Sequence, residues 1–467
     1  MKKIWTITLL VLLGIIAIIP MVLSLFKGNV YCDEGYYLSI VDSIGKGYIP
    51  YTTMSLGYPP LWFYILAGFK LIFHIPDGLY EPYLIIHYFT VFGCVCIIYR
   101  IVNTYIPNKV ICYLSSIFFL LSSHWLRGNY VLLEIPSILF GLLSLYVILR
   151  KSNFKLINNI FAGFFASCAC LCKQYGIGFL LLDIFMLSHN KTKKDIVPLL
   201  LGASIPIMLS FVLWGKSFGQ IWISDYGAIN TDANLRQELL GKIKQIGWGI
   251  SYLILMIFPG ILLCGFTFRY KIDKEKHTIL LLSIFGITGF LLQFFFNRSL
   301  HYFLYLLPFV CILFGIFVEW AHNQNKMLKY ISICLLSLSF VGGIVHTYYR
   351  VVLKIYLTGQ DRSGYYAVGK EIKDALPNGS TVYFPFEYGP YEQYFFSGFL
   401  PPNIEHIGYS FGPLGLSEHE RKLQASSADF IIIRKDANVY DELLLNEIKS
   451  RAETSLSDVY MLVYSKK

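Results

Sequence analysis

The chain has 467 residues, of which 55% are hydrophobic and only 15% are charged, and its formal net charge at pH 7 is +10. Soluble domains carry about 25% charged residues, so this composition excludes an ordinary soluble protein. The positive excess lies before Tyr349, in short loops between apolar runs. It therefore indicates membrane topology and not a nucleic-acid surface, and we expect no nucleic-acid partner.

The apolar runs predict an α-helical polytopic membrane protein with about 11 transmembrane helices, and residues 1–349 are expected to form this domain. The first run follows Lys2 and Lys3 and is too long for a signal peptide, so we interpret it as a retained span. The expected spans are residues 5–25, 82–106, 110–124, 136–150, 156–172, 175–189, 196–214, 246–267, 278–296, 302–320 and 328–347.

The basic loops predict the orientation of these spans in a cell or inner membrane. If the N-terminus is cytoplasmic, every basic cluster falls on the cytoplasmic side, as the positive-inside rule requires. The clusters are Arg100/Lys109, Arg150/Lys151/Lys155, Lys191/Lys193/Lys194, Arg269/Lys271/Lys274/Lys276 and Lys326/Lys329. This parity holds only if residues 60–75, which follow Pro59-Pro60, form a helix at the outer interface and do not cross.

Residues 361–467 change in character and are expected to form a small extracytoplasmic α/β domain. The pattern predicts helices over 363–376 and 440–451 and strands over 381–386, 428–434 and 459–464. This region contains no catalytic motif.

Three carboxylates of the predicted outer loops are candidate site residues. Asp33 and Glu34 directly follow the first span, where charged groups are costly unless they are paired or used. A helix starting there would hold both at its N-terminus, where the helix dipole favours negative charge; simple capping by Asp33 is the alternative. Glu134 stands in the next outer turn, before Pro136, and its alternative role is an ion pair with Arg127.

Two cations and a histidine are also expected on the outer side. Lys173 interrupts an apolar hairpin, and Arg298 and His301 stand at the start of the tenth span. Cations at such positions commonly bind an anion, and a lipid phosphate is the natural one at a membrane surface. The alternatives are snorkelling to lipid headgroups for the cations and an ordinary hydrogen-bonded role for His301.

Taken in order, these elements resemble the protein O-mannosyltransferase and aminoarabinose-transferase superfamily of GT-C glycosyltransferases. The resemblance covers residues 1 to about 350 and, loosely, the C-terminal region. It rests on the Asp33-Glu34 pair, the Gly-x-x-Pro-Tyr element at 47–51, Pro59-Pro60-Leu61, Glu134, Lys173 and residues 298–308. One departure is Tyr58, because relatives that modify lipid A often have a lysine directly before the Pro-Pro.

The resemblance implies transfer of a hexosyl or pentosyl group from a polyprenyl-phosphate carrier to a glycan, lipid or protein acceptor at the extracytoplasmic face, with inversion at the anomeric carbon. It implies Asp33 as general base, Glu34 shaping the site, and Glu134 binding acceptor or metal. No cofactor is certain, and a divalent metal is left open.

The resemblance also implies the groups that bind the two substrates. The donor phosphate would be held by Lys173, Arg298, His301 and Tyr302. The acceptor or sugar would contact Tyr37, Tyr58 and Arg127. We therefore expect the early acidic pair and the later cations to converge in a single pocket at the outer surface.

Other classes of membrane protein stay open. A transporter or flippase of lipid-linked sugars would place ionisable groups at mid-membrane in repeated halves. Here most acidic residues of the membrane half lie in or near loops, with Asp183 the main exception, and no repeat is visible. A polysaccharide polymerase or ligase would lack the early Asp-Glu loop. A catalytically inactive relative that serves as a binding scaffold is the third alternative.

Overall fold

A computed structural model describes residues 2–28, 30, 32–54, 56, 58–126, 128, 130–150, 154–189, 192–227, 274–294, 300–322, 326–353, 362–384, 391–400, 426–434, 453–455 and 460–464. The chain divides into two compact units. The first, called the helical unit, comprises Met1–Phe26, Ile85–Leu209 and Asn230–Gly359. The second, called the mixed unit, comprises Lys27–Leu84, Ser210–Ile229 and Gln360–Lys467.

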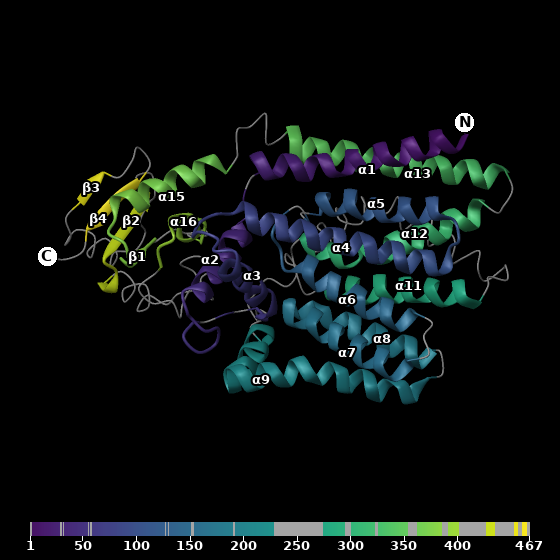
Figure 1. Ribbon diagram of the computed structural model, residues 1–467, viewed down its shortest axis with the longest axis horizontal. Coiled ribbons are helices and arrows are strands. Elements are labelled where there is room, and N and C mark those ends of the chain that lie inside the picture. Colours follow the sequence, from purple (N-terminus) through teal and green to yellow (C-terminus); the bar gives the residue numbers. More distant parts are fainter. Residues whose placement is uncertain are drawn as a thin grey trace, which may run out of the picture. The chain divides into compact units, whose positions relative to one another are not determined.

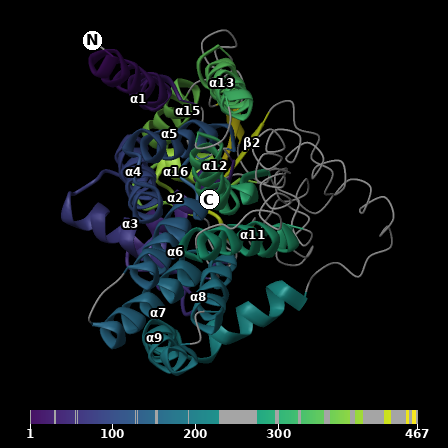
Figure 2. The ribbon, with the colours of Figure 1, turned by 90° about the vertical axis from the view of Figure 1, so that its right-hand side faces the viewer.

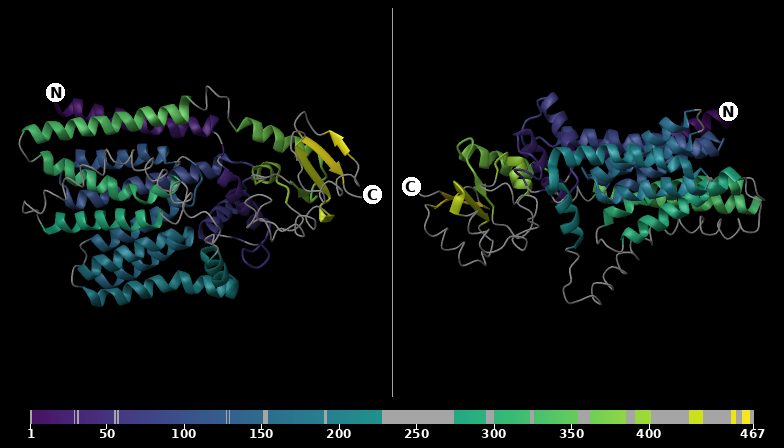
Figure 3. Two further views of the ribbon diagram at one scale, coloured as in Figure 1. Left: turned by 180° about the vertical axis from the view of Figure 1, so that it is seen from behind. Right: turned by 90° about the horizontal axis from the view of Figure 1, so that it is seen from below.

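The helical unit consists of long helices that lie alongside one another (Figures 1 and 3) and are seen nearly end-on in Figure 2. The helices are α1 (Lys2–Lys27), α4 (Glu81–Tyr105), α5 (Lys109–Trp125), α6 (Glu134–Leu149), α7 (Lys155–Cys172), α8 (Ile177–His189), α9 (Ile196–Gly227), α11 (Lys274–Phe294), α12 (Leu307–His322) and α13 (Lys326–Thr347). The last residue of α1, the first residues of α4 and the part of α9 from Ser210 belong to the mixed unit.

The chain is an integral membrane protein. Among the described residues, four helical stretches are long and apolar enough to cross a bilayer, namely Thr6–Lys27, Glu81–Tyr105, Lys155–Cys172 and Lys193–Gly215. Each expected span coincides with a helix of the structure, except residues 246–267, which lie outside the described part. The total of 11 spans stays a prediction.

Small residues bring the backbones of α7 and α9 into close contact. A Cβ atom on Gly163 would lie 1.8 Å from the carbonyl oxygen of Leu199, and one on Gly202 would lie 1.9 Å from the carbonyl oxygen of Ile160. Glycine allows such an approach because it has no side chain, and small residues drive helix packing in membranes, where lipid removes most of the hydrophobic gain. The two glycines therefore fix the distance between α7 and α9.

Serine hydroxyls add hydrogen bonds between these helices. The Ser137 hydroxyl of α6 donates to the Ala169 carbonyl of α7 at 2.8 Å, and the Ser167 hydroxyl of α7 donates to the Ala203 carbonyl of α9 at 2.7 Å. Hydroxyl bonds of this kind are worth on the order of 1 kcal/mol each in a bilayer. Together they hold α6, α7 and α9 in one register.

The mixed unit contains the remaining short helices and a four-stranded sheet of order β1-β2-β4-β3. Its elements are α2 (Cys32–Gly45), α3 (Leu61–Ile72), α15 (Ser363–Ala375), α16 (Tyr391–Ser397), β1 (Val382–Tyr383), β2 (Phe430–Arg434), β3 (Glu453–Ser455) and β4 (Tyr460–Tyr464). Strand β1 pairs with β2 in parallel, and the other pairs are antiparallel. A core that includes Ile372, Val382 and Ile432 lies between the sheet and the helices.

The sequence predicted α2, α3, α15 and three of these strands, but not α16 or β3. Helix α3 starts at Leu61, directly after Pro59-Pro60, as expected. Its 12 residues span roughly 18 Å, less than the ~30 Å of a hydrocarbon core. Its position at the outer interface and the extracytoplasmic location of residues 361–467 stay predictions. The expected helix over 440–451 lies outside the described residues.

Candidate active site

Three of the predicted site residues stand at one end of the helical unit. The ends of the described helices next to the basic clusters, namely the end of α4 and the starts of α5, α7, α9, α11 and α13, lie at the end shared with the N-terminus, at the right in Figure 1. The starts of α6, α8 and α12 lie at the opposite end. Glu134 is the first residue of α6, Lys173 lies between α7 and α8, and His301 lies shortly before α12.

Glu134, Lys173 and His301 form a buried charged cluster. The Lys173 ammonium lies 3.0 Å from Glu134 Oε1, and His301 Nε2 lies 3.5 Å from the same oxygen. Glu134 and Lys173 are fully buried and His301 is 2% exposed. The half-buried Tyr302 ring stands 5.4 Å from the Lys173 ammonium and packs edge-on against Tyr175.

Glu134 owes its place to the start of α6. It is the first helical residue, and Pro136 lies in the same turn, where a missing N–H costs no helical hydrogen bond. The positive end of the helix dipole favours a carboxylate there. The local sequence therefore places Glu134 at the N-terminus of α6.

Lys173 is held by a tight turn between α7 and α8. Its backbone is extended, with φ −153° and ψ 133°, yet its N–H still donates to the Ala169 carbonyl at 3.1 Å. The following turn η1 (Gln174–Gly176) folds back onto α7, where a Cβ on Gly176 would lie only 2.3 Å from the Ala169 carbonyl carbon. Only glycine fits this turn, so Gly176 fixes where Lys173 leaves the helix.

The structure thus brings together residues that the sequence had assigned to separate tasks. Lys173 and His301 were expected to bind phosphate, and Glu134 to bind acceptor or metal. Because Glu134 pairs with Lys173, an incoming anion must compete with this carboxylate for the ammonium. Arg127 and Arg298, the other expected cations, lie outside the described residues.

The Asp33-Glu34 pair lies in the first turn of α2, in the mixed unit, as the sequence predicted. Asp33 is half-buried and Glu34 is fully buried. The Tyr80 hydroxyl donates a short hydrogen bond to Glu34 Oε1. Asp33 is therefore the member of the pair that is open to solvent.

Tyrosines pack beside this pair. Tyr37 is 1% exposed and lies edge-on to Tyr58 with ring centroids 5.6 Å apart; it also packs on Phe63. The Tyr51 hydroxyl donates to the Tyr58 carbonyl at 2.5 Å. Of the two predicted tyrosine contacts, Tyr58 is half-buried and Tyr37 is buried.

The sequence did not identify the partners of Tyr80. The Arg362 guanidinium lies 4.7 Å from the Tyr80 ring centroid and 3.4 Å from Glu81 Oε1. The Tyr366 hydroxyl accepts from the Tyr80 N–H at 3.0 Å and donates to Glu81 Oε2 at 2.5 Å. The C-terminal segment thus contacts the residue that holds Glu34. No local motif marks Arg362, so a single sequence carries no signal for it.

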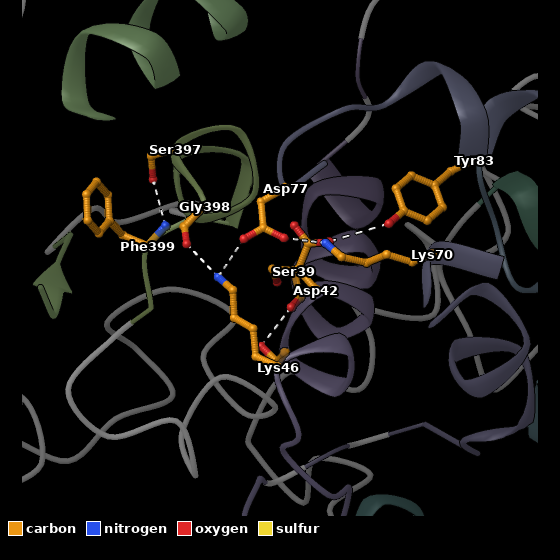
Figure 4. A network of polar contacts seen from close by, with 10 residues as sticks. Ser39, Asp42, Lys46, Lys70, Asp77, Tyr83, Ser397, Gly398 and Phe399 are labelled. Carbon is orange, nitrogen blue, oxygen red and sulfur yellow. Dashed lines mark hydrogen bonds and ion pairs between the residues drawn. The ribbon is translucent and has the colours of Figure 1, made fainter. Parts of the chain in front are cut away.

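A charge network that the sequence did not predict is formed by Asp42, Lys46, Lys70 and Asp77 (Figure 4). The Lys70 ammonium contacts one oxygen each of Asp42 and Asp77. Lys46 Nζ lies 3.2 Å from Asp77 Oδ2 and donates to the Gly398 carbonyl at 2.6 Å. The network therefore links α2, α3, the loop after α3 and the turn after α16.

Burial raises the pKa of Asp42 to about 6, although the Lys70 ammonium acts in the opposite direction. Burial also acts to raise the pKa of Asp77, but Lys70 and Lys46 hold it below its usual value. The groups that face Asp42 are Lys70, Asp77, Lys46 and the Tyr83 hydroxyl at 3.4 Å. Asp42 is therefore the member of the network whose charge changes in mildly acidic solution.

This pKa predicts a pH-dependent difference between wild type and Asp42→Asn. Between pH ~4 and 6 the folded state binds the Asp42 proton more tightly than the unfolded state, so this contribution to stability grows as the pH falls through 6. From pH 7 to pH 5 the unfolding free energy of wild type should gain roughly 1 kcal/mol relative to Asp42→Asn. Thermal unfolding of both proteins at the two pH values measures it, and a pH-independent difference would contradict the assignment.

In the described part of the chain, no three His, Cys, Asp or Glu side chains are grouped so as to hold a metal ion. A divalent metal thus stays an expectation from the resemblance alone. No protein-family model matches the chain, and no curated protein matches it in sequence.

Solved structures match the fold. ArnT from Cupriavidus metallidurans in the apo state is 10% identical, with a TM-score of 0.66 over 99% of this chain and 98% of that one. ArnT bound to undecaprenyl phosphate is 11% identical, with a TM-score of 0.62 over the same shares. The archaeal oligosaccharyltransferase AglB from Archaeoglobus fulgidus, in complex with an inhibitory peptide and a dolichol-phosphate, is 11% identical, with a TM-score of 0.54 over 97% of this chain and 73% of that one. The predicted GT-C fold is confirmed.

Proposed function

We propose that the chain is a membrane glycosyltransferase that moves a sugar from a polyprenyl-phosphate carrier to a glycan, lipid or protein acceptor, with inversion at the anomeric carbon. Two observations of other proteins support the donor class. ArnT, which shares the fold, binds undecaprenyl phosphate, and AglB binds a dolichol-phosphate. In this proposal the N-terminus is cytoplasmic, and the chemistry and residues 361–467 are extracytoplasmic.

The observation that carries the proposal is the buried Glu134–Lys173–His301 cluster at the end of the helical unit opposite the basic connections. By the positive-inside rule the basic end is cytoplasmic, so the cluster faces the outer leaflet. A buried ammonium next to a half-buried aromatic ring suits a lipid phosphate better than a soluble anion, because the lipid brings its headgroup to this depth. In this proposal the membrane lipids surround the protein, and the donor reaches the site from the same bilayer.

The proposed reaction needs little from the protein besides position and charge. Asp33 takes the proton of the acceptor hydroxyl as its oxygen bonds to the anomeric carbon. The bond from that carbon to the carrier phosphate breaks, and polyprenyl phosphate leaves with the electron pair. Lys173, Arg298 and His301 stabilise the charge that builds on the phosphate.

The other predicted residues have supporting roles in this proposal. Glu34 shapes the site around Asp33, and Tyr302 lies beside the phosphate. Glu134 pairs with Lys173 in the absence of the carrier. With the carrier phosphate bound to Lys173, Glu134 would be available to bind the acceptor or a metal ion. Tyr37, Tyr58 and Arg127 contact the acceptor or sugar.

A transfer assay in detergent separates this function from lipid transport. The purified protein is mixed with a carrier that bears a radiolabelled sugar and with candidate acceptors, and water-soluble or acceptor-linked label is measured. A transferase works without a bilayer, whereas a flippase has no measurable activity there. Label that stays on the carrier in detergent, together with carrier movement across vesicle membranes, would overturn the proposal in favour of transport.

The role assigned to Arg298 predicts a binding defect. Arg298→Ala should raise the carrier concentration needed for half-maximal transfer by about tenfold, because one charge-assisted contact to phosphate is lost. Arg100→Ala, which changes an exposed arginine at the basic end, is the matched control and should behave as wild type. An unchanged carrier requirement in Arg298→Ala would argue against phosphate contact.

A further inference from the structure

The charge network has a high desolvation cost, so a contribution to stability alone does not account for it. Asp42 is 3% exposed and Lys70 is 7% exposed, and Asp42 Oδ2 has no hydrogen-bond partner. Removing such charges from water offsets most of their attraction, so apolar residues of similar volume often stabilise a fold as well. The best-attested use of buried ion pairs is to specify one arrangement of the elements that carry them.

The network attaches α2 at the end distant from the Asp33-Glu34 pair. Asp42 follows Glu34 by about two helical turns, roughly 12 Å along the axis. At the near end, the Tyr80 hydroxyl donates to Glu34. At the far end, the Lys70 ammonium pairs with both Asp42 and Asp77. The 70–80 segment thus holds α2 at two separated points, which fixes the tilt of the helix as well as its position.

The C-terminal segment completes this attachment. Gly398 has a φ of +73°, and its carbonyl accepts the Lys46 hydrogen bond. A Cβ on Gly398 would lie 3.2 Å from the Asp77 Cβ, so the turn after α16 lies directly against the loop that carries Asp77. The turn therefore limits the movement of both Lys46 and Asp77.

We propose that Lys70 is a positioning residue: by holding Asp42 and Asp77 together it fixes the tilt of α2 and so aims Asp33 and Glu34, with the turn after α16 closing the network. The aiming part rests on the proposed function, whereas the attachment of α2 does not. Displacing a catalytic group by about 1 Å can cost on the order of 100-fold in rate. A lysine that touches no substrate can thus control turnover.

Three variants of the full-length protein separate positioning from folding. Lys70→Met should lower kcat for transfer about 100-fold with the KM for carrier within about twofold. Lys70→Arg, which keeps the charge, should recover kcat to within about tenfold of wild type. Asp42→Asn/Lys70→Met removes both charges and should recover the melting temperature without recovering kcat. Lys109→Met, at an exposed lysine, is the matched control.

Two kinetic results would overturn the proposal. One is a double variant that regains kcat together with its melting temperature, which would make the network structural only. The other is a Lys70→Met protein whose KM for carrier rises while kcat is unchanged, which would place Lys70 in substrate binding.

Amide hydrogen exchange tests the attachment without any transfer reaction. In Lys70→Met the amides of α2 should exchange at least about tenfold faster than in wild type, while those of α6 and α7 stay protected. If wild type shows no transfer but this difference is present, the proposed function fails and the attachment stands. Unchanged protection of α2 would overturn the attachment itself.

Discussion

Replacing Asp33 by asparagine is expected to abolish sugar transfer, lowering turnover by about 100- to 10,000-fold, the range ascribed to a positioned general base. Asparagine keeps the shape of the side chain but cannot accept the acceptor proton. The half-buried place of Asp33 in the first turn of α2, beside the fully buried Glu34, makes it the accessible base of the pair. Single-turnover transfer from a radiolabelled carrier in purified vesicles measures the effect.

Carrier binding and expression should be intact in Asp33→Asn, because the proposal gives Asp33 no contact with the carrier phosphate. Asp374→Asn alters an exposed aspartate of α15 in the same unit and is the control for a nonspecific loss. Undiminished turnover in Asp33→Asn would remove Asp33 from the proposed role.

Lys173→Met is expected to have the largest effect on stability and to abolish carrier binding as well. The substitution leaves Glu134 fully buried without its ammonium partner, and breaking a buried pair in this way costs roughly 3–5 kcal/mol. His301, at 3.5 Å from Glu134 Oε1, could replace part of the lost charge by taking up a proton. Thermal unfolding in detergent and carrier titration measure the two effects separately.

The double variant Glu134→Gln/Lys173→Met distinguishes a structural ion pair from a phosphate ligand. It removes both charges, so most of the lost stability should return. Carrier binding should stay absent, because the ammonium is still missing. Lys155→Met, at an exposed lysine near the other end of α7, should change neither quantity. A double variant that binds carrier normally would show that Lys173 serves the fold alone.

The parts of the fold that the sequence predicted are those set by local pattern. Apolar runs marked the long helices, and Pro59-Pro60 marked the start of α3, because both signals act within a few residues. The two missed elements, α16 and β3, are short, with 7 and 3 residues. Segments of that length become regular through tertiary packing and carry little periodic signal of their own.

The candidate residues were found more readily than their partners. Glu134, Lys173 and His301 stood out because a charge is costly in an apolar setting. Which of them would pair depended on how the α5–α6, α7–α8 and α11–α12 connections meet, and the chain order does not contain that information. Lys70 carries no comparable signal, because a single lysine is common in an apolar helix at a membrane interface, where its side chain can reach water.

The close approach of α7 and α9 at Gly163 and Gly202 has a consequence for residues distant from both glycines. A methyl group at either position would force α7 and α9 apart, because the obstructing atoms are carbonyl oxygens of the main chain. Lys173 leaves α7 at its end, roughly 15 Å beyond Gly163. The spacing of α7 and α9 at these glycines thus affects the position of the Lys173 ammonium. We therefore expect homologous proteins to keep both glycines as strictly as the charged residues.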